Sequence, residues 1–127
     1  NNVKCLDVVS SGFFDTIGLY RKCTTEQEML AKEWMMVFNV VHLSEVSFQK
    51  VSSGEQRLLL LARALVKNPE LLILVEPLHG LDVVNKNRVK KILEEFCDGD
   101  KSLIYVTHYQ NEIPNVVDKQ LVLTKNK

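Results

Sequence analysis

Three groups of polar residues in this chain have types and positions that suit chemistry on a phosphate. Residues 52–55 stand before a leucine-rich run, Glu76 follows five apolar residues, and His108 follows another apolar segment. A helix start offers free amide groups to an anion, a carboxylate accepts a proton from water, and a neutral imidazole donates and accepts hydrogen bonds. The sequence therefore indicates phosphate binding, provided that the fold brings these groups into neighbouring loops.

The first group is the predicted start of a helix. Ser52 and Glu55 have the spacing of a capping box, so we expect the helix to begin at Ser53. The free amides and the helix dipole attract a phosphate there, and Gly54 has no side chain to keep the anion away from the backbone. Taken alone, this short pattern favours an ordinary helix cap without a ligand. The two other groups, further along the chain, reverse that balance.

Glu76 stands at the carboxyl end of a predicted strand at 71–75. That run is short and fully apolar, which is typical of a central strand covered on both faces. Ligands gather at the carboxyl ends of strands in parallel sheets. The alternative is a glutamate that only starts a loop before Pro77. His108 follows the next predicted strand, and this position favours a functional role over the structural one that a lone histidine more often has.

The elements that must position these groups follow from hydrophobic spacing, helix caps and turn residues. The pattern predicts three helices, then a strand, a helix and two strands, and a strand, helix, strand unit implies parallel pairing. Thr24 with Gln27, or Thr25 with Glu28, is expected to cap the second helix. The predicted helices lie within 3–14, at 26–40, from Ser53 to a stop at Asn68–Pro69, and from Asp82 to Gly99; the predicted strands lie at 71–75, 102–107 and 120–124, with a loop at 42–50 and a helical turn at 112–117.

Composition bounds the class of protein. The 127 residues carry 16 Lys and Arg against 16 Asp and Glu, so no bulk charge favours nucleic acid or an anionic membrane. Three cysteines without paired spacing indicate reduced thiols. No apolar run approaches the ~20 residues that span a bilayer, and the first residues have no secretory character. We expect a cytoplasmic location, with attachment at the inner face of the membrane as an open alternative.

The order of the three groups resembles the second half of an ABC-type (ATP-binding cassette) ATPase. The implied fold class is α/β of the P-loop NTPase type, present as a partial domain with part of a mainly parallel sheet. Residues 1–50 would form a helical subdomain and residues 51–127 the second half of the ATPase core. The matching motifs are the signature loop at 51–55 (Val-Ser-Ser-Gly-Glu for the family's Leu-Ser-Gly-Gly-Gln), the Walker B strand at 71–76, the D-loop at 80–82 and the H-loop at 107–110.

The resemblance implies roles for particular residues. In the family, the signature loop closes over the γ-phosphate of ATP held by an opposing half, the strand-end Glu polarises water, and the H-loop His contacts the γ-phosphate. A second ABC half or another copy is therefore an implied partner. The implied catalytic residues are Glu76 and His108, and the implied ATP-binding residues are Ser52, Ser53, Gly54, Glu55 and Asp82.

Two departures from the family pattern affect the expected activity. Val75 stands where the family places the Asp that holds Mg²⁺, and valine has no oxygen for a hard cation. ATP and Mg²⁺ are the cofactors implied for the complete domain, with weakened Mg²⁺ binding, and no residue here is assigned as a metal ligand. The Gly-rich Walker A loop ending in Lys is not found in the sequence. We expect no ATP hydrolysis by this chain alone, and we expect self-association through apolar strand surface at 71–75 and 103–106.

A narrower resemblance concerns residues 11–20, 35–40, 65–69 and 76–78. These are similar to the tandem ATP-binding proteins associated with molybdate transport, the ModF type, so a link to molybdate or metal-anion transport is implied. Whether a membrane permease is a partner stays open. A non-catalytic interaction or regulatory module with a decayed nucleotide site is the main alternative. A recombination or repair ATPase is disfavoured because no sustained heptads appear.

Overall fold

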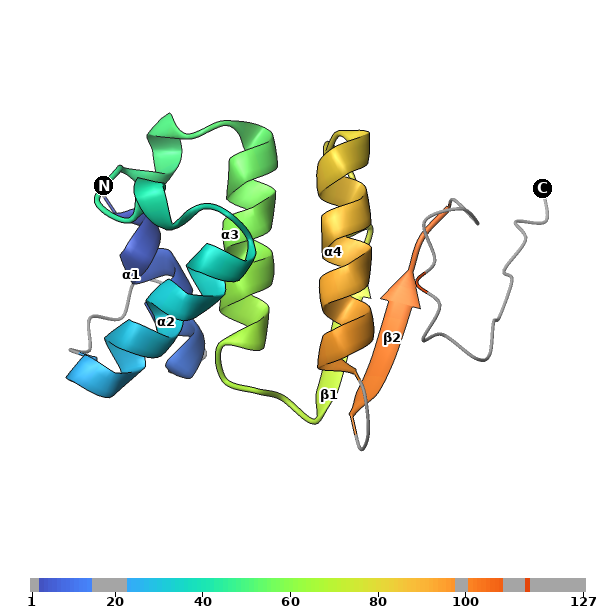
Figure 1. Ribbon diagram of the computed structural model, residues 1–127, viewed down its shortest axis with the longest axis horizontal. Helices are drawn as coiled ribbons and strands as arrows, with labels where there is room; N and C mark the ends of the chain where they lie inside the picture. The colour runs from blue at the N-terminus through green and yellow to red at the C-terminus, as the bar shows by residue number, and fades with distance from the viewer. Residues whose placement is uncertain (1–2, 15–22, 98–100, 109–113, 115–127) are drawn as a thin grey trace, which may run out of the picture.

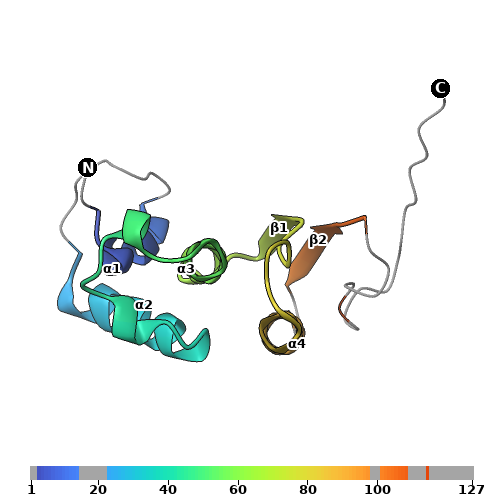
Figure 2. The same cartoon turned by 90° about the horizontal axis from the view of Figure 1, so that it is seen from above.

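The computed structural model describes residues 3–14, 23–97, 101–108 and 114. Three helices, α1, α2 and α3, lie together at one end, and α4 lies with the strands β1 and β2 at the other (Figure 1). Seen from above, α3 lies between the α1–α2 pair and β1 (Figure 2). The bounds are α1 Cys5–Ser10, α2 Thr25–Val37, α3 Ser53–Leu65, β1 Leu71–Val75, α4 Val83–Phe96 and β2 Ser102–Val106, with short 3₁₀ turns at Ser11–Phe13, Val41–Leu43 and Phe48–Lys50.

Local capping fixes the helix starts as the sequence predicts. At α3, the Ser52 hydroxyl accepts a hydrogen bond from the Glu55 amide at 3.1 Å, and the Glu55 carboxylate accepts one from the Ser52 amide at 2.9 Å. At α2, the same reciprocal pair joins Thr24 and Gln27, which decides between the two predicted caps. Both boxes satisfy amides that the first helical turn leaves without partners.

The end of α2 differs from its prediction. The helix was expected to continue to residue 40, but it ends at Val37. Asn39 has a φ of 60°, in the left-handed region where asparagine is tolerated, and the Val40 amide turns back to the Met35 carbonyl at 2.8 Å. The prediction of a longer helix relied on apolar spacing, which continues to Val40 and gives no sign of the turn at Asn39.

The strands confirm the predicted parallel pairing. β1 and β2 pair in register from Leu71 opposite Ser102 to Val75 opposite Val106. Figure 2 shows α4 on one side of this strand pair, and Val89 and Leu93 of α4 are fully buried in the same core as Leu72 of β1.

The prediction that β1 is covered on both faces is wrong for the described part of the chain. Leu72 and Leu74 are buried, whereas Leu71, Ile73 and Val75 are 52%, 58% and 62% exposed. Because successive strand side chains point to opposite faces, coverage by α4 buries only one set. The neighbouring strand shows the same apolar exposure, with Ile104 at 48% and Val106 at 47%.

Close backbone contact joins the turn after α1 to α3. A Cβ placed on Gly12 would lie 2.3 Å from the Arg63 carbonyl oxygen and 2.6 Å from a Val66 methyl carbon. The Arg63 guanidinium donates a hydrogen bond to the Ser11 hydroxyl at 2.8 Å beside this contact. Only glycine therefore fits at position 12 without displacing α3.

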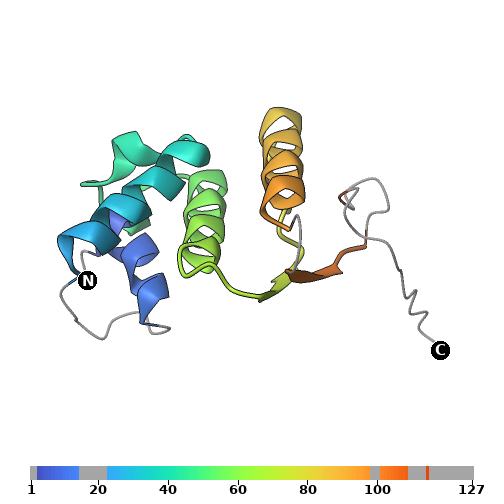
Figure 3. The same ribbon diagram turned by 60° about the horizontal axis from the view of Figure 1, so that its bottom comes forward.

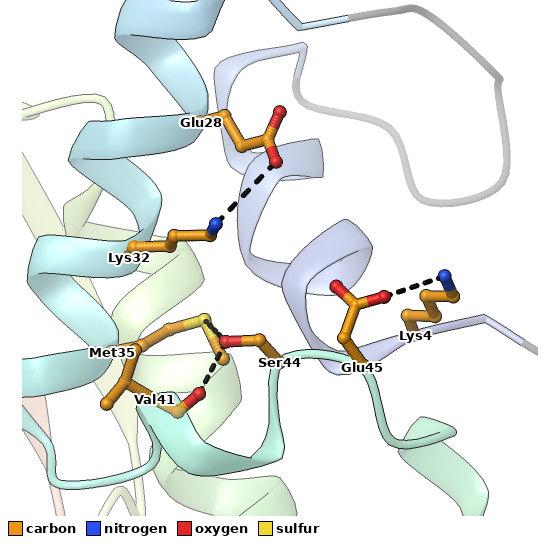
Figure 4. Close-up of polar contacts among 7 residues, drawn as sticks. All are labelled: Lys4, Glu28, Lys32, Met35, Val41, Ser44 and Glu45. Atoms are coloured by element: carbon orange, nitrogen blue, oxygen red, sulfur yellow. Dashed lines mark hydrogen bonds and ion pairs between the residues drawn. The ribbon is translucent and has the colours of Figure 1, made fainter.

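Polar contacts tie the segment after α2 to the start of α1 (Figure 4). Lys4 and Glu45 form an ion pair at 2.8 Å, and the Ser44 hydroxyl donates to the Val41 carbonyl at 2.5 Å and contacts the Met35 sulfur at 3.9 Å. The hydrogen bond from Lys4, together with its charge, holds the pKa of Glu45 below its usual value. The folded-state pKa is lowered, so this contact is present at neutral pH and is lost as pH falls through the lowered pKa.

Aromatic rings connect the helical end to α4. The Trp34 ring of α2 lies edge-on to the Phe96 ring of α4 with centroids 5.8 Å apart, and Phe38 lies 6.3 Å from Trp34. The Lys101 ammonium sits 5.0 Å from the centre of the Phe96 ring. The helical end (α1, α2 and α3) and the end formed by α4 and the strands therefore share one continuous hydrophobic core.

The fourth helix was expected to run up to Gly99, but α4 ends earlier, at Phe96, with Cys97 as its C-cap. The predicted strand at 120–124 lies outside the described residues, and so does the predicted helical turn at 112–117 apart from Pro114. No helix of the described part is long and apolar enough to cross a membrane.

Replacing Gly12 by Ala should lower the free energy of unfolding by about 1–3 kcal/mol, because the added methyl group meets main-chain atoms of α3 that cannot rotate away. Denaturant unfolding followed by circular dichroism measures the change. Gly54→Ala is the matched control, since its Cβ would meet neighbours at ordinary distances of 3.7 and 3.8 Å. Equal stability of the two variants would contradict the close contact at Gly12.

The open face of the strand pair should cause the chain to self-associate at high concentration. Ile73→Lys places a charge on that face and should shift sedimentation towards the monomer. Met36→Lys is the matched control, because Met36 on α2 is 58% exposed, as is Ile73. A wild-type chain that sediments as a monomer at high concentration would show that this face does not drive association.

Candidate functional site

Glu76 and His108 meet at the carboxyl ends of the paired strands. The Glu76 amide donates to the Val106 carbonyl at 2.7 Å, which extends the parallel ladder by one residue beyond Val75. The His108 amide then donates to Oε1 of Glu76 at 2.8 Å, and the His108 Nε2 lies 3.9 Å from the same oxygen. Two residues that the sequence singled out separately therefore form one site.

The backbone of Glu76 has an uncommon conformation. Its φ is 48°, in the left-handed region, where a non-glycine residue usually needs a structural reason. The Glu76 carbonyl accepts from the His79 amide at 3.2 Å as the chain turns away from β1. The side chain of Glu76 is 23% exposed and that of His108 is 87% exposed. The carboxylate is thus half-buried at the strand ends, and the imidazole is open to solvent.

The start of α3 lies on the same side of the molecule. The amino ends of α3 and α4 and the carboxyl ends of β1 and β2 all face the side that is uppermost in Figure 1, and the two helix starts are again uppermost in Figure 3. A Cβ on Gly54 would lie 3.7 Å from the Gly80 carbonyl oxygen and 3.8 Å from Leu81 Cδ2. The helix start therefore touches the turn that follows Glu76.

The residues at the α3 start leave donors available to an anion. Ser52 and Ser53 are exposed, and Gly54 and Glu55 are half-buried. The Ser52 hydroxyl accepts from the Glu55 amide, so its own proton can still be donated. The Glu55 carboxylate holds the Ser52 amide and brings negative charge to this helix end, where the family's glutamine would be neutral.

Asp82 has a structural partner in this fold. Its Oδ1 accepts from the Asn85 amide at 2.8 Å, which makes it the N-cap of α4 as the sequence predicts. The cap explains an aspartate at this position without a ligand. Its predicted role in ATP binding stays a prediction.

The structure thus forms two groups from the predicted site residues. Glu76 and His108 are hydrogen-bonded to each other, and the α3 start is packed against the turn at Gly80 and Leu81. Sequence reasoning missed the contribution of the His108 main chain, because a backbone amide leaves no trace in residue type. It also missed the left-handed Glu76, since a residue before proline is normally extended.

Metal-binding side chains are not gathered within the ranges that the structure describes. No group of three His, Cys, Asp or Glu side chains there is arranged to hold a metal ion. Val75, next to Glu76, presents its apolar side chain to solvent with 62% exposure.

Cys5, Cys23 and Cys97 are free thiols, as predicted. Burial raises the pKa of each thiol above its ordinary value, so all three stay protonated near neutral pH. Protonated thiols are poor nucleophiles and poor metal ligands.

Comparison with known proteins identifies the family. A profile of the ABC transporter family matches residues 3–79, more than half of the 127 residues. The chain therefore belongs to the ABC transporter family.

Several curated relatives are similar over most of this chain. It is 35% identical over 117 residues to the ABC transporter ATP-binding protein ModF of Escherichia coli, covering 91% of this chain and 24% of ModF. It is 28% identical over 121 residues to the molybdate import ATP-binding protein MolC of Haemophilus influenzae, covering 94% of this chain and 48% of MolC. The chain spans about a quarter to a half of the length of the curated relatives it matches.

Solved structures share the fold. An ABC transporter in an inward-facing conformation matches with a TM-score of 0.72 and 26% identity, covering 88% of this chain and 46% of that one. A dimeric ATP-binding cassette bound to ADP and phosphate matches with a TM-score of 0.74 and 21% identity, covering 87% and 48%. The predicted fold class, a partial α/β domain of the P-loop NTPase type, is confirmed.

The cap at the start of α3 gives a stability test. Ser52→Ala removes the acceptor for the Glu55 amide and should lower the free energy of unfolding by about 1 kcal/mol. Ser53→Ala is the matched control, because this exposed neighbour lies inside the helix and is not its N-cap residue. A similar effect of the two changes in denaturant unfolding would contradict the cap.

Proposed function

We propose that this chain is the carboxyl-terminal portion of an ABC-type ATPase domain, and part of a protein that binds and hydrolyses ATP as a full-length dimer or tandem. The observation that carries the proposal is the Glu76–His108 contact at the carboxyl ends of two parallel strands. There the His108 amide donates a hydrogen bond of 2.8 Å to the half-buried Glu76 carboxylate. Ligands of parallel α/β sheets bind at this edge, and a carboxylate there can take a proton from water. Residues 1–50 are assigned to a helical subdomain and residues 51–127 to the ATPase core.

Each site residue has a proposed role. Glu76 accepts a proton from the attacking water, and the exposed imidazole of His108 donates a hydrogen bond to the γ-phosphate. The α3 start, made of Ser52, Ser53, Gly54 and Glu55, closes over ATP held by the opposing half, since its exposed end offers donors to an anion. Asp82, at the turn beside it, stands at the boundary between the halves.

The residues present fit ATP better than they fit its metal ion. When bound, Mg²⁺ neutralises charge on the phosphates. Val75 supplies no oxygen at the position beside Glu76, so we propose that Mg²⁺ binding is weakened there. The chain alone is expected not to hydrolyse ATP, because the Lys-containing loop that cradles phosphates in P-loop NTPases is not found in its sequence.

The transported substrate and partners are proposed from the relatives. The similarity to the molybdate import protein MolC, together with the resemblance of several segments to the ModF type, supports a link to molybdate or metal-anion transport. The proposed partners are a second ABC half, in tandem or as another copy, and a membrane permease. The proposed location is the cytoplasm, at the inner face of the membrane when a permease is engaged.

One observation favours a second function, a non-catalytic regulatory module that keeps the ATPase architecture. Val75 removes the oxygen that would hold Mg²⁺, which is what decay of a nucleotide site would produce. Such a module would bind a partner half without turnover.

Two substitutions in the full-length protein separate these functions. Glu76→Gln removes the proton acceptor and should trap ATP in a stable dimer, seen by size-exclusion chromatography with retained nucleotide. Glu95→Gln, on an exposed position of α4, is the matched control and should leave turnover unchanged. Val75→Asp should raise Mg²⁺-dependent turnover. Turnover at background in both the wild type and Val75→Asp, with no trapping by Glu76→Gln, would favour the regulatory module.

A further inference from the structure

The contact between Glu76 and His108 is made by a main-chain group. The His108 amide lies 2.8 Å from Oε1 of Glu76, within hydrogen-bonding distance, whereas the imidazole Nε2 lies 3.9 Å away, beyond it. The imidazole is also 87% exposed, so water screens any charge that it carries. Distance and exposure both select the amide as the group that holds the carboxylate.

We infer that the main-chain amide of His108, and not its imidazole, positions the carboxylate of Glu76. The inference rests on the proposed function, in which Glu76 is the proton acceptor. His108 then acts on Glu76 as a positioning residue through its backbone, and its side chain is left free for a phosphate.

Val106, the last residue of β2, and His108, two residues beyond it, each form a hydrogen bond with Glu76, and we call this pair of bonds the clamp. The Glu76 amide donates to the Val106 carbonyl at 2.7 Å, and two residues later the His108 amide donates to the Glu76 carboxylate. A residue with a φ of 48° persists only when its surroundings hold it there. The end of β2 therefore fixes both the backbone and the side chain of Glu76.

The clamp distinguishes the two carboxylate oxygens. Both contacts with His108 involve Oε1, and Glu76 keeps 23% side-chain exposure. A carboxylate has two oxygens that accept hydrogen bonds, so with Oε1 engaged, Oε2 is the oxygen assigned to accept a proton from water.

A pH titration of the labelled chain by ¹H–¹⁵N NMR tests this positioning without any nucleotide. The amide proton of residue 108 should move upfield as Glu76 becomes protonated in acid, in the wild type and equally in His108→Ala, which keeps the amide. The movement should vanish in Glu76→Gln. The Ser52 amide is an internal control, because it donates to the Glu55 carboxylate at 2.9 Å and should titrate in every folded variant.

Two outcomes would overturn the inference. One is an amide of residue 108 that does not move in acid in the wild type while the Ser52 amide does. The other is loss of the movement in His108→Ala, which would assign the positioning to the imidazole. If His108→Ala fails to fold, the comparison of the wild type with Glu76→Gln still decides the first outcome. Failure here would leave ATP trapping by Glu76→Gln possible, and failed trapping would leave this titration unchanged, so the two proposals fail separately.

Discussion

The rest of the structure depends on the register of two parallel strands. Val75 of β1 lies opposite Val106 of β2, and the Glu76 amide continues the ladder to the Val106 carbonyl. Because side chains alternate between faces, a slip of one residue would turn Leu72 and Leu74 away from α4 and separate Glu76 from the His108 amide. The pairing of β1 with β2 thus supports both the core and the site, where it brings Glu76 to His108, 32 positions later in the chain.

The helices provide the hydrophobic packing that two strands alone lack. A pair of strands is at most marginally stable in water, and here α4 covers one face while α3 continues the core into the helical end. The ring contact between Trp34 and Phe96 joins α2 to α4 across the molecule. The start of α3 is held beside the turn at Gly80, so the amino end of this helix and the Glu76–His108 contact share one side of the protein.

The sequence predicted the features that local chemistry determines. The start of α3 at Ser53, the strand at 71–75 and the Asp82 cap each follow from residues within a few positions, and the structure confirms all three. The parallel pairing followed from a topological rule and is also confirmed. The resemblance of the motif order to ABC-type ATPases is confirmed by the family match over residues 3–79.

The remaining features depend on contacts that residue types do not record. The early end of α2 depends on a left-handed Asn39, and the open face of β1 depends on which elements cover it. Two hydrogen bonds hold the left-handed Glu76. Its own amide donates to the Val106 carbonyl, and its carboxylate accepts from the backbone amide of His108, a group common to almost every residue. Spacing within the sequence could place Glu76 and His108 at neighbouring strand ends but could not say which atoms meet.

Scalar coupling across the hydrogen bond between Glu76 and Val106 tests the strand register most directly. In a labelled sample, we expect a coupling between the Glu76 amide nitrogen and the Val106 carbonyl carbon, matching the 2.7 Å contact. A coupling from the Glu76 nitrogen to the carbonyl of Tyr105 or Thr107 instead would place the strands in a different register and contradict the site described above.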